Sequence, residues 1–313
     1  MNNKPNLIFM GTPDFAVPSL KVLSENGYNV LMVVTQPDRP KGRGRKVLPP
    51  PVKEAAQDIG YDVIQPVSIN NEAFFDTITG LKPDIFIVVA YGHILPKNIL
   101  AIPEKGAINL HASLLPKYRG PAPIQWAIIN GEKETGVTTM LMDDGMDTGD
   151  ILLLSKEKIT AADTSVTLHD RLSVLGGDLL IKTLKSFENN DVNPIAQDHD
   201  SATYAPLLKK GDGRIVWENT AEQIDSFIRG MTPWPGSFTF QNDKRLKIFS
   251  AKPILVEVDE APGTVIKGFP DELRIATGKS ALSVIEIQGA SGKRLLIKDF
   301  LLGNQMPPGT VLN

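Results

Sequence analysis

Short apolar runs alternate with helix-length amphipathic stretches through the first 188 residues. Strands are predicted at 7–10, 30–35, 62–64, 85–90, 107–110, 136–142 and 151–159, and helices at 14–25, 52–59, 72–79, 123–129 and 165–187. Strands that alternate with helices are typical of βαβ units around a parallel sheet. We therefore predict an α/β domain over residues 1–188, with a Rossmann-like, mostly parallel sheet and helices on both faces.

The pattern changes after residue 188. Residues 189–206 are polar and lack periodicity, which predicts a linker. One helix at 221–229 is then followed by short alternating strands at 237–240, 245–251, 263–266, 273–276, 282–287 and 294–297. Short strands separated by turn residues favour a small barrel. We predict an OB-like C-terminal β-barrel domain over residues 207–313.

Composition narrows the class of protein. A chain of 313 residues is longer than a single hydrophobic core usually supports, so two domains are expected. Its content of 42% hydrophobic and 22% charged residues is typical of globular domains. No apolar run approaches the roughly 20 residues that cross a membrane. The absence of cysteine excludes disulfides, a thiol nucleophile and Cys-ligated metals. The N-terminus enters an apolar run too early for a secretory signal, so we expect a cytoplasmic protein without a membrane span.

Positive charge is concentrated in one segment, although the net charge is −3. Residues 38–53 carry a single acid, Asp38, and six basic residues, which are Arg39, Lys41, Arg43, Arg45, Lys46 and Lys53. Most such charge runs are solvated loops. A flexible basic loop with Gly42 and Gly44 also suits phosphate contacts that order on binding. The charge pattern leaves both interpretations open.

Two polar residues leave the end of the predicted strand at 107–110. Asn109 and His111 are two apart, so an extended backbone points both side chains to one face. Ligands of open α/β sheets bind outside the carboxyl ends of the strands. An amide donor and an imidazole could therefore act on one reacting atom. The ordinary alternative is a strand-end Asn that satisfies a turn and a half-buried His bonded to backbone.

Four aspartates follow the strand at 136–142, in the sequence LMDDGMDTGD. The spacing does not match an EF-hand calcium loop. An Asp/Gly turn explains Asp143 and Asp144, and Asp150 could belong to it. Asp147 is the candidate that could orient His111 and stabilise its protonated form. The turn at Gly11 lacks the G-x-G-x-x-G spacing, which argues against a dinucleotide-dependent oxidoreductase.

Several segments carry a family resemblance. They are GTPDFA at 11–16, TQPDRPKGRGRK at 35–46, NLHASLLPKYRGPAPIQWAI at 109–128, DDGMDTGD at 143–150 and TPWPGSF at 232–238. In this order they resemble the folate-dependent formyltransferase family along nearly the whole chain. The N-x-H plus Asp pattern marks the wider family, and the basic segment with the added C-terminal domain narrows the resemblance to methionyl-tRNA formyltransferases.

The resemblance implies a reaction and its residues. The formyl group of 10-formyltetrahydrofolate would move to the α-amine of methionyl initiator tRNA, for translation initiation. Asn109, His111 and Asp147 match the catalytic positions, and Ser113, Leu114, Leu115 and Pro116 match the folate-contacting turn. The tRNA acceptor stem would contact Arg39, Lys41, Arg43, Arg45 and Lys46. We expect no metal, because hydrogen-bond donors suffice for a reactive formyl carbonyl, and we expect a monomer.

Other functions remain open at this point. The same chemistry could act on a small amine, such as glycinamide ribonucleotide or an amino sugar, but the basic segment and second domain would then lack a purpose. A noncatalytic RNA-binding protein could share the scaffold, against which the Asn109, His111 and Asp147 set argues. In the C-terminal half, the possible phosphate partners are Lys209, Lys210, Lys244, Arg245 and Lys247.

Overall fold

The chain forms two compact units. The computed structural model describes residues 4–41, 46–290 and 292–313, with nothing stated for the side chain of Lys41. The first unit comprises Met1–Pro123, Glu134–Lys158 and His169–Ala205. The second comprises Ile124–Lys133, Ile159–Leu168 and Pro206–Asn313. Within the described residues, no helix is long and apolar enough to cross a membrane.

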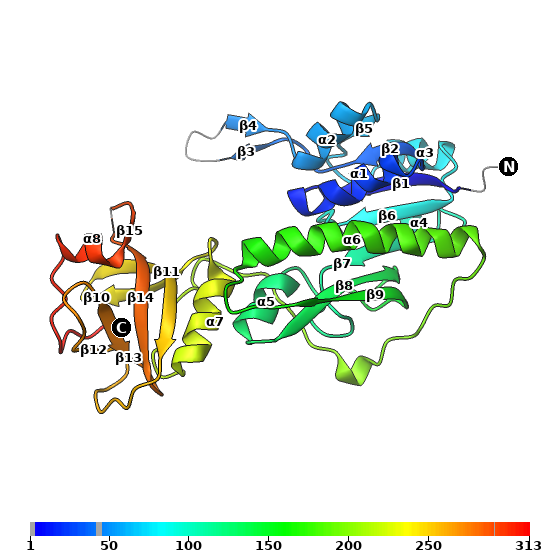
Figure 1. Ribbon diagram of the computed structural model, residues 1–313. Helices are drawn as coiled ribbons and strands as arrows, with labels where there is room; N and C mark the ends of the chain where they lie inside the picture. The colour runs from blue at the N-terminus through cyan, green and yellow to red at the C-terminus, as the bar shows by residue number, and fades with distance from the viewer. Residues whose placement is uncertain (1–3, 42–45, 291) are drawn as a thin grey trace. The chain divides into compact units, whose positions relative to one another are not determined.

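The first unit is built on a sheet in which seven strands are described, in the order β5-β2-β1-β6-β7-β8-β9 (Figure 1). The strands are β1 (Asn6–Gly11), β2 (Asn29–Val34), β5 (Val63–Ile64), β6 (Ile85–Val89), β7 (Ala107–His111), β8 (Glu134–Leu141) and β9 (Ile151–Lys158). Pairing is parallel from β5 to β7, and β8 runs antiparallel to both of its neighbours. The mostly parallel α/β sheet predicted from the sequence is confirmed.

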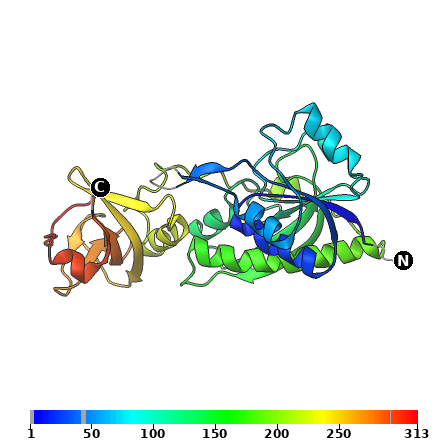
Figure 2. The same cartoon turned by 90° about the horizontal axis from the view of Figure 1, so that it is seen from above.

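Helices pack on both faces of this sheet, as Figure 2 shows from above. They are α1 (Val17–Glu25), α2 (Pro51–Ile59), α3 (Glu72–Gly80), α4 (Lys97–Leu100) and α6 (Ser165–Glu188), with a 3-10 turn at Asp14–Ala16. Ile8 and Phe86 share a buried cluster with Phe74 of α3 and Ile99 of α4. On the other face α6 approaches β7 closely, because a Cβ on Gly176 would lie 2.6 Å from Leu110.

Two features of the first unit were not predicted. The helix α4 is not among the predicted helices, and the basic segment is predicted to be a flexible loop. Instead β3 (Arg39–Lys41) pairs antiparallel with β4 (Lys46–Leu48), and we call this pair the basic ribbon. Arg43 and Arg45 lie outside the described residues.

The second unit contains an antiparallel sheet that curls around its own core. The described strands follow the order β10-β11-β14-β13-β12, with β15 on β14. They are β10 (Ser237–Gln241), β11 (Lys244–Ile254), β12 (Val265–Ile266), β13 (Leu273–Ala276), β14 (Ala281–Gln288) and β15 (Arg294–Leu296). The helices are α5 (Pro123–Ile129), α7 (Ala221–Met231) and α8 (Ile297–Leu301). The expected barrel-like C-terminal fold is confirmed, although helix α8 begins where a strand was predicted to end.

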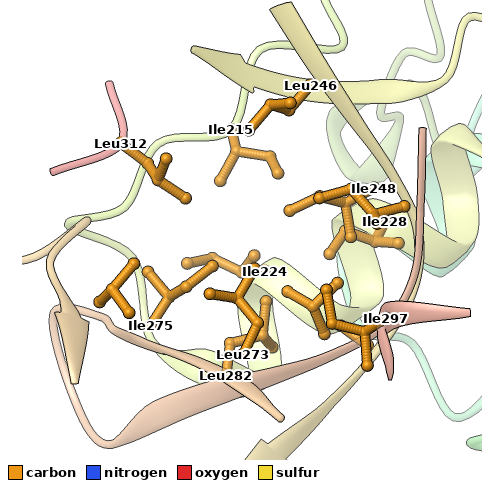
Figure 3. Packing of buried hydrophobic residues seen from close by; sticks show 14 of the residues in the cluster. Ile215, Ile224, Ile228, Leu246, Ile248, Leu273, Ile275, Leu282, Ile297 and Leu312 are labelled. Atoms are coloured by element: carbon orange, nitrogen blue, oxygen red, sulfur yellow. The ribbon is translucent and has the colours of Figure 1, made fainter. Parts of the chain in front are cut away.

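The C-terminal residues join the two edges of this sheet. Asn313 exchanges backbone hydrogen bonds with Phe240 of β10, while Thr310 accepts one from Val265 of β12. Leu312 is 2% exposed and belongs to the same core as Ile224 of α7 (Figure 3). Bridging the edge strands in this way removes unpaired backbone groups that would otherwise invite aggregation.

Candidate functional site

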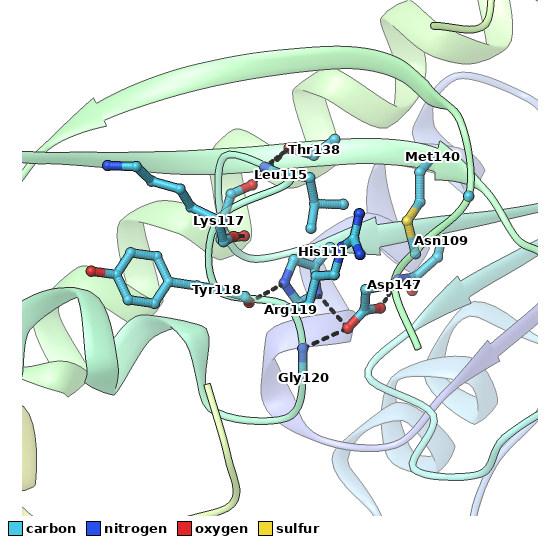
Figure 4. Close-up of polar contacts among 12 residues, drawn as sticks. Asn109, His111, Leu115, Lys117, Tyr118, Arg119, Gly120, Thr138, Met140 and Asp147 are labelled. Atoms are coloured by element: carbon cyan, nitrogen blue, oxygen red, sulfur yellow. Dashed lines mark hydrogen bonds and ion pairs between the residues drawn. The ribbon is translucent and has the colours of Figure 1, made fainter. Parts of the chain in front are cut away.

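Three side chains meet beside the carboxyl end of β7 (Figure 4). Asn109 and His111 extend from the strand, and Asp147 comes from the loop after β8. The amide Nδ2 of Asn109 lies 3.4 Å from Asp147 Oδ1, and His111 Nδ1 lies 3.6 Å from Asp147 Oδ2. Both distances are long for hydrogen bonds, so these side chains lie close together but interact only weakly with one another. We call them the site trio.

The surroundings of His111 determine its tautomer. The ring is 7% exposed, and Nε2 lies 2.9 Å from the backbone oxygen of Tyr118. Because a carbonyl oxygen only accepts, Nε2 must carry the hydrogen and donate it. Nδ1, which faces Asp147, is then the nitrogen that can accept or release a proton.

Asp147 is held in an uncommon backbone conformation, with φ of 55°. The left-handed region is costly for residues other than Gly and persists where surrounding contacts impose it. Here the backbone N–H of Gly120 donates to Asp147 Oδ2 at 2.8 Å. The carboxyl side chain is 16% exposed, so it is close to the surface yet has fixed partners.

The turn from Ser113 to Pro116 follows β7 after the single residue Ala112. Its backbone is fixed by Thr138, whose hydroxyl donates to Ser113 O at 2.7 Å and accepts from Leu115 N at 3.2 Å. The Ser113 hydroxyl is fully buried and donates to Lys117 O at 2.6 Å. Leu114 and Pro116 are half-buried, and the peptide between Leu115 and Pro116 is cis. The side-chain surface that the turn exposes is therefore mainly apolar.

A second group of residues behind the site was not predicted. Arg119 is 2% exposed and contacts Gln197, which in turn donates to the backbone oxygens of Asp147 and Gly149. The segment 189–205, which the sequence predicts as a linker, is grouped with the first unit. No local pattern indicates these contacts, because Arg119 and Gln197 are 78 residues apart.

The strand next to β7 also ends in an unusual segment. Ala90, directly after β6, has φ of 46°. Burial raises the pKa of Tyr91 to about 12, so its hydroxyl stays protonated at neutral pH. Among the described residues no hydrogen-bond partner is found for this hydroxyl. Strained backbone often clusters at functional sites, and here it occurs at Ala90 after β6, at Tyr118, whose backbone oxygen contacts His111, and at Asp147.

The basic ribbon has a polar anchor at its base. Arg39 donates to Gln36 Oε1 at 2.9 Å, and Gln65 donates both to Gln36 O and to Asp38. Hydrogen bonds from Gln65 and then Lys53 lower the pKa of Asp38. Lys53, one of the six basic residues of the segment, is thus neutralised by an ion pair of 2.9 Å.

The ribbon and the site trio are separate groups. Lys46 is exposed, and the backbone of Lys41 pairs with it. In the described parts of the chain, neither Arg39 nor Lys46 shares a hydrogen bond or ion pair with the trio. The same parts contain no group of three or more His, Asp or Glu residues that could hold a metal ion.

A mostly parallel α/β sheet with an imidazole, a carboxylate and an amide at the carboxyl end of a strand is typical of enzymes that carry out acid–base and group-transfer chemistry. Residues 5–184 match the family model of formyl transferase, and residues 207–305 match the formyl transferase C-terminal domain. The chain is 51% identical over 307 residues to the methionyl-tRNA formyltransferase of Caldanaerobacter subterraneus subsp. tengcongensis, covering 98% of this chain and 99% of the relative. It is 50% identical to that of Desulforamulus reducens, covering 98% and 97%. The chain therefore belongs to the formyl transferase family, among the methionyl-tRNA formyltransferases.

Solved structures share the fold at lower identity. The N-formyltransferase from Helicobacter canadensis, in complex with folinic acid and dTDP-3-aminofucose, has a TM-score of 0.70 at 21% identity, covering 92% of this chain and 99% of its own. HypX from Aquifex aeolicus in complex with tetrahydrofolic acid has a TM-score of 0.62 at 17% identity, covering 96% and 47%. At these identities the comparison establishes the fold alone.

Proposed function

We propose that this enzyme transfers the formyl group of 10-formyltetrahydrofolate to the α-amine of methionyl initiator tRNA, in the cytoplasm, for translation initiation. The observation that carries the proposal is the convergence of Asn109, His111 and Asp147 within 3.6 Å at the end of β7. The full-length similarity to proteins named methionyl-tRNA formyltransferase supports the choice of acceptor.

The proposed chemistry uses the side-chain donors and the carboxylate of the site trio. The amine nitrogen attacks the formyl carbon, and the carbonyl oxygen becomes an oxyanion. Asn109 Nδ2 and a protonated His111 Nδ1 donate hydrogen bonds to this oxyanion, and one such donor is typically worth about 100- to 1,000-fold in rate. Asp147 orients His111 and stabilises its positive charge. The carbon–nitrogen bond to the folate then breaks, the amine loses a proton, and the folate nitrogen gains one.

We propose that the turn of Ser113, Leu114, Leu115 and Pro116 contacts the folate. Its half-buried Leu114 and Pro116 offer apolar surface beside the trio, and the fixed backbone of the turn limits the entropy lost on binding. The proposed steps need no metal, because a formyl carbonyl is reactive enough for hydrogen-bond donors.

The basic ribbon is proposed to bind the acceptor stem through Arg39, Lys41, Arg43, Arg45 and Lys46. A ribbon with an anchored base and an exposed Lys46 suits phosphate contacts, which are strong at low salt and weaken as salt rises.

The second unit offers an independent RNA-binding face. Phe238 and Phe240 lie on one face of β10, with ring centroids 5.7 Å apart. The guanidinium of Arg245 lies 3.6 Å from the centre of Phe238, and that of Arg214 lies 5.9 Å from Phe240. Phe238 is only 7% exposed and Phe240 is partly exposed, so the rings mainly support the guanidinium groups of Arg245, which is partly exposed, and Arg214, which is exposed. Guanidinium groups held in this way suit contacts with phosphates and bases. We call these four residues the arginine–phenylalanine face.

In this proposal the monomeric chain is organised as a catalytic domain at 1–188, a linker at 189–206 and a tRNA-binding domain at 207–313. The arginine–phenylalanine face lies in the third of these segments. If the basic ribbon and the C-terminal domain both contact one tRNA, this would explain why a formyl transferase carries a second domain.

The test is formyl transfer from 10-formyltetrahydrofolate by the purified full-length protein. Methionyl initiator tRNA, uncharged initiator tRNA and glycinamide ribonucleotide are offered in separate reactions, and the formylated product is identified by mass after hydrolysis. We expect formylmethionine from the first reaction only. Transfer to glycinamide ribonucleotide alone would replace the acceptor with a small amine, and absence of transfer from a folded protein would overturn the proposal.

A further inference from the structure

Arg119 carries a buried charge that the site trio does not use. Its side chain is 2% exposed, and it ranks among the largest fully buried side chains of the chain. Nε and Nη2 donate to Gln197 Oε1 at 3.1 and 2.7 Å, and Nη2 lies 3.1 Å from His199 Nδ1. Among the described residues no carboxylate is paired with this guanidinium. A buried charge held only by neutral groups is expensive, so its retention requires another explanation.

The guanidinium fixes the orientation of Gln197. Arginine only donates hydrogen bonds, so the Gln197 oxygen must face Arg119 and the NH₂ group must face the opposite way. That NH₂ donates to Asp147 O at 3.0 Å and to Gly149 O at 2.7 Å. Gln197 is 6% exposed, which leaves little competition from water.

Both carbonyls belong to the loop that presents the catalytic carboxylate. Residues 143–146 of this loop are exposed, so few packing contacts hold it from outside. The left-handed φ of 55° at Asp147 therefore depends on contacts with its own backbone and side chain. Gln197 holds the backbone from one side, while the N–H of Gly120 holds the carboxylate.

We propose that Arg119 and Gln197 are positioning residues, which act on the reaction through Asp147 and touch neither substrate. This inference rests on the proposed role of Asp147 as a catalytic residue. Arg119 fixes the orientation of the Gln197 amide. Gln197 in turn stabilises the left-handed backbone of Asp147, which directs the carboxylate toward His111. Misplacement of a catalytic group by about 1 Å can cost about 100-fold in rate.

The substitution Gln197→Glu separates this role from folding. The carboxylate keeps the shape of the amide and pairs with Arg119, so burial of the guanidinium is still compensated. It can no longer donate to the carbonyls of Asp147 and Gly149, which repel its oxygens. Gln57→Glu, at an exposed position of α2, adds the same negative charge far from these contacts in sequence and serves as the matched control.

The experiment is a double-mutant cycle on single-turnover formyl transfer to methionyl initiator tRNA. We expect Gln197→Glu to lower the single-turnover transfer rate at saturating tRNA about 10- to 100-fold, with the half-saturating concentration within about twofold, and Gln57→Glu to change neither. In an Asp147→Ala background we expect Gln197→Glu to lower the residual rate by less than about twofold, because the carboxylate that it positions is gone.

Equal losses in both backgrounds would overturn the inference, as would an unchanged rate of the folded Gln197→Glu enzyme. If that variant does not fold by circular dichroism, Gln197→Asn, which withdraws the amide by one methylene, is taken through the same cycle with the same expectations. A wild-type enzyme without any formyl transfer would count against the proposed function. If the wild type is active and the effects of Gln197→Glu and Asp147→Ala are additive, the result would count against this inference alone.

Discussion

His111 has one nitrogen committed to the fold and one left for chemistry. The hydrogen on Nε2 is donated to Tyr118 O, so Nδ1 is the nitrogen that faces Asp147. Asp147 is held at two points, because its backbone oxygen accepts from Gln197 and its carboxylate Oδ2 accepts from the N–H of Gly120, and the carboxylate lies beside His111 and Asn109. At the scale of single residues, the structure thus leaves Nδ1 of His111 facing the carboxylate of Asp147.

Asn109 should contribute to turnover far more than to stability. Its amide lies 3.4 Å from Asp147, too far for a strong hydrogen bond, so little folding energy depends on it. We expect Asn109→Ala to lower kcat about 100- to 1,000-fold, the usual loss for one oxyanion donor. Steady-state kinetics and thermal denaturation check this, with Asn189→Ala at an exposed position as the control. A loss of stability that accounts for the whole loss of activity would contradict it.

The sequence carries part of this site and not the rest. The i, i+2 spacing of Asn109 and His111 follows from strand periodicity, and it places both side chains on one face. Selecting Asp147 from four neighbouring aspartates depended on the acid–base argument and on the family resemblance. Arg119 and Gln197 gave no signal, because hydrogen bonds over 78 residues leave no periodic pattern.

Among the elements, α7 shows how much a sequence pattern can specify. Thr220 and Gln223 form a capping box, in which each side chain bonds to the backbone of the other residue. The basic ribbon shows the opposite case, because three-residue strands are too short to produce alternation. The edge-joining C-terminal residues were also missed, since their partners at Phe240 and Val265 are distant in sequence.

The cap of α7 should have a measurable effect on the second unit. Removing an N-cap hydroxyl costs about 1 kcal/mol, because backbone N–H groups of the first turn lose their acceptor. We expect Thr220→Ala to lower the free energy of unfolding of the transition that includes α7 by about this amount. Urea denaturation of the full chain measures it, and Thr220→Ser, which keeps the hydroxyl, should remain near wild type. Equal losses for both variants would contradict a capping effect.

The basic ribbon should influence tRNA affinity through charge. Each phosphate contact releases condensed counterions, so removing one lysine reduces the salt dependence of binding. We expect Lys46→Ala to weaken tRNA binding and to lower the slope of log K against log salt by about one. Binding titrations over a salt series check this, with the exposed Lys21 of α1 mutated to Ala as the matched control. An unchanged slope would remove Lys46 from the interface.

At the scale of the whole molecule, the order of elements along the chain predicted two differently folded domains. It did not predict that segments from the N-terminal half belong to the second unit. Residues Ile124–Lys133 and Ile159–Leu168 group with the second unit, although the sequence reads them as part of the α/β pattern. Gly230 of α7 explains part of this grouping, because a Cβ there would lie 2.6 Å from Ile129 of α5. Such close packing depends on three-dimensional contacts that hydrophobic periodicity does not encode.

The arginine–phenylalanine face should matter only for an acceptor that carries RNA. We expect Arg245→Ala to weaken binding of methionyl initiator tRNA and to leave kcat at saturating tRNA unchanged, because the face lies in the second unit and the site trio in the first. Arg274, which is paired with Glu272, provides the matched control when mutated to Ala. Binding titration and steady-state kinetics separate the two effects, and a fall in kcat with unchanged affinity would contradict the assignment.

The central claim is that the site trio carries out the transfer, and one rate tests it most directly. In single-turnover reactions with 10-formyltetrahydrofolate and saturating methionyl initiator tRNA, wild type is compared with His111→Ala. We expect the transfer rate to fall at least about 100-fold, while tRNA affinity measured by titration stays within about twofold. A folded His111→Ala enzyme that transfers formyl groups at a near-normal rate would contradict the claim.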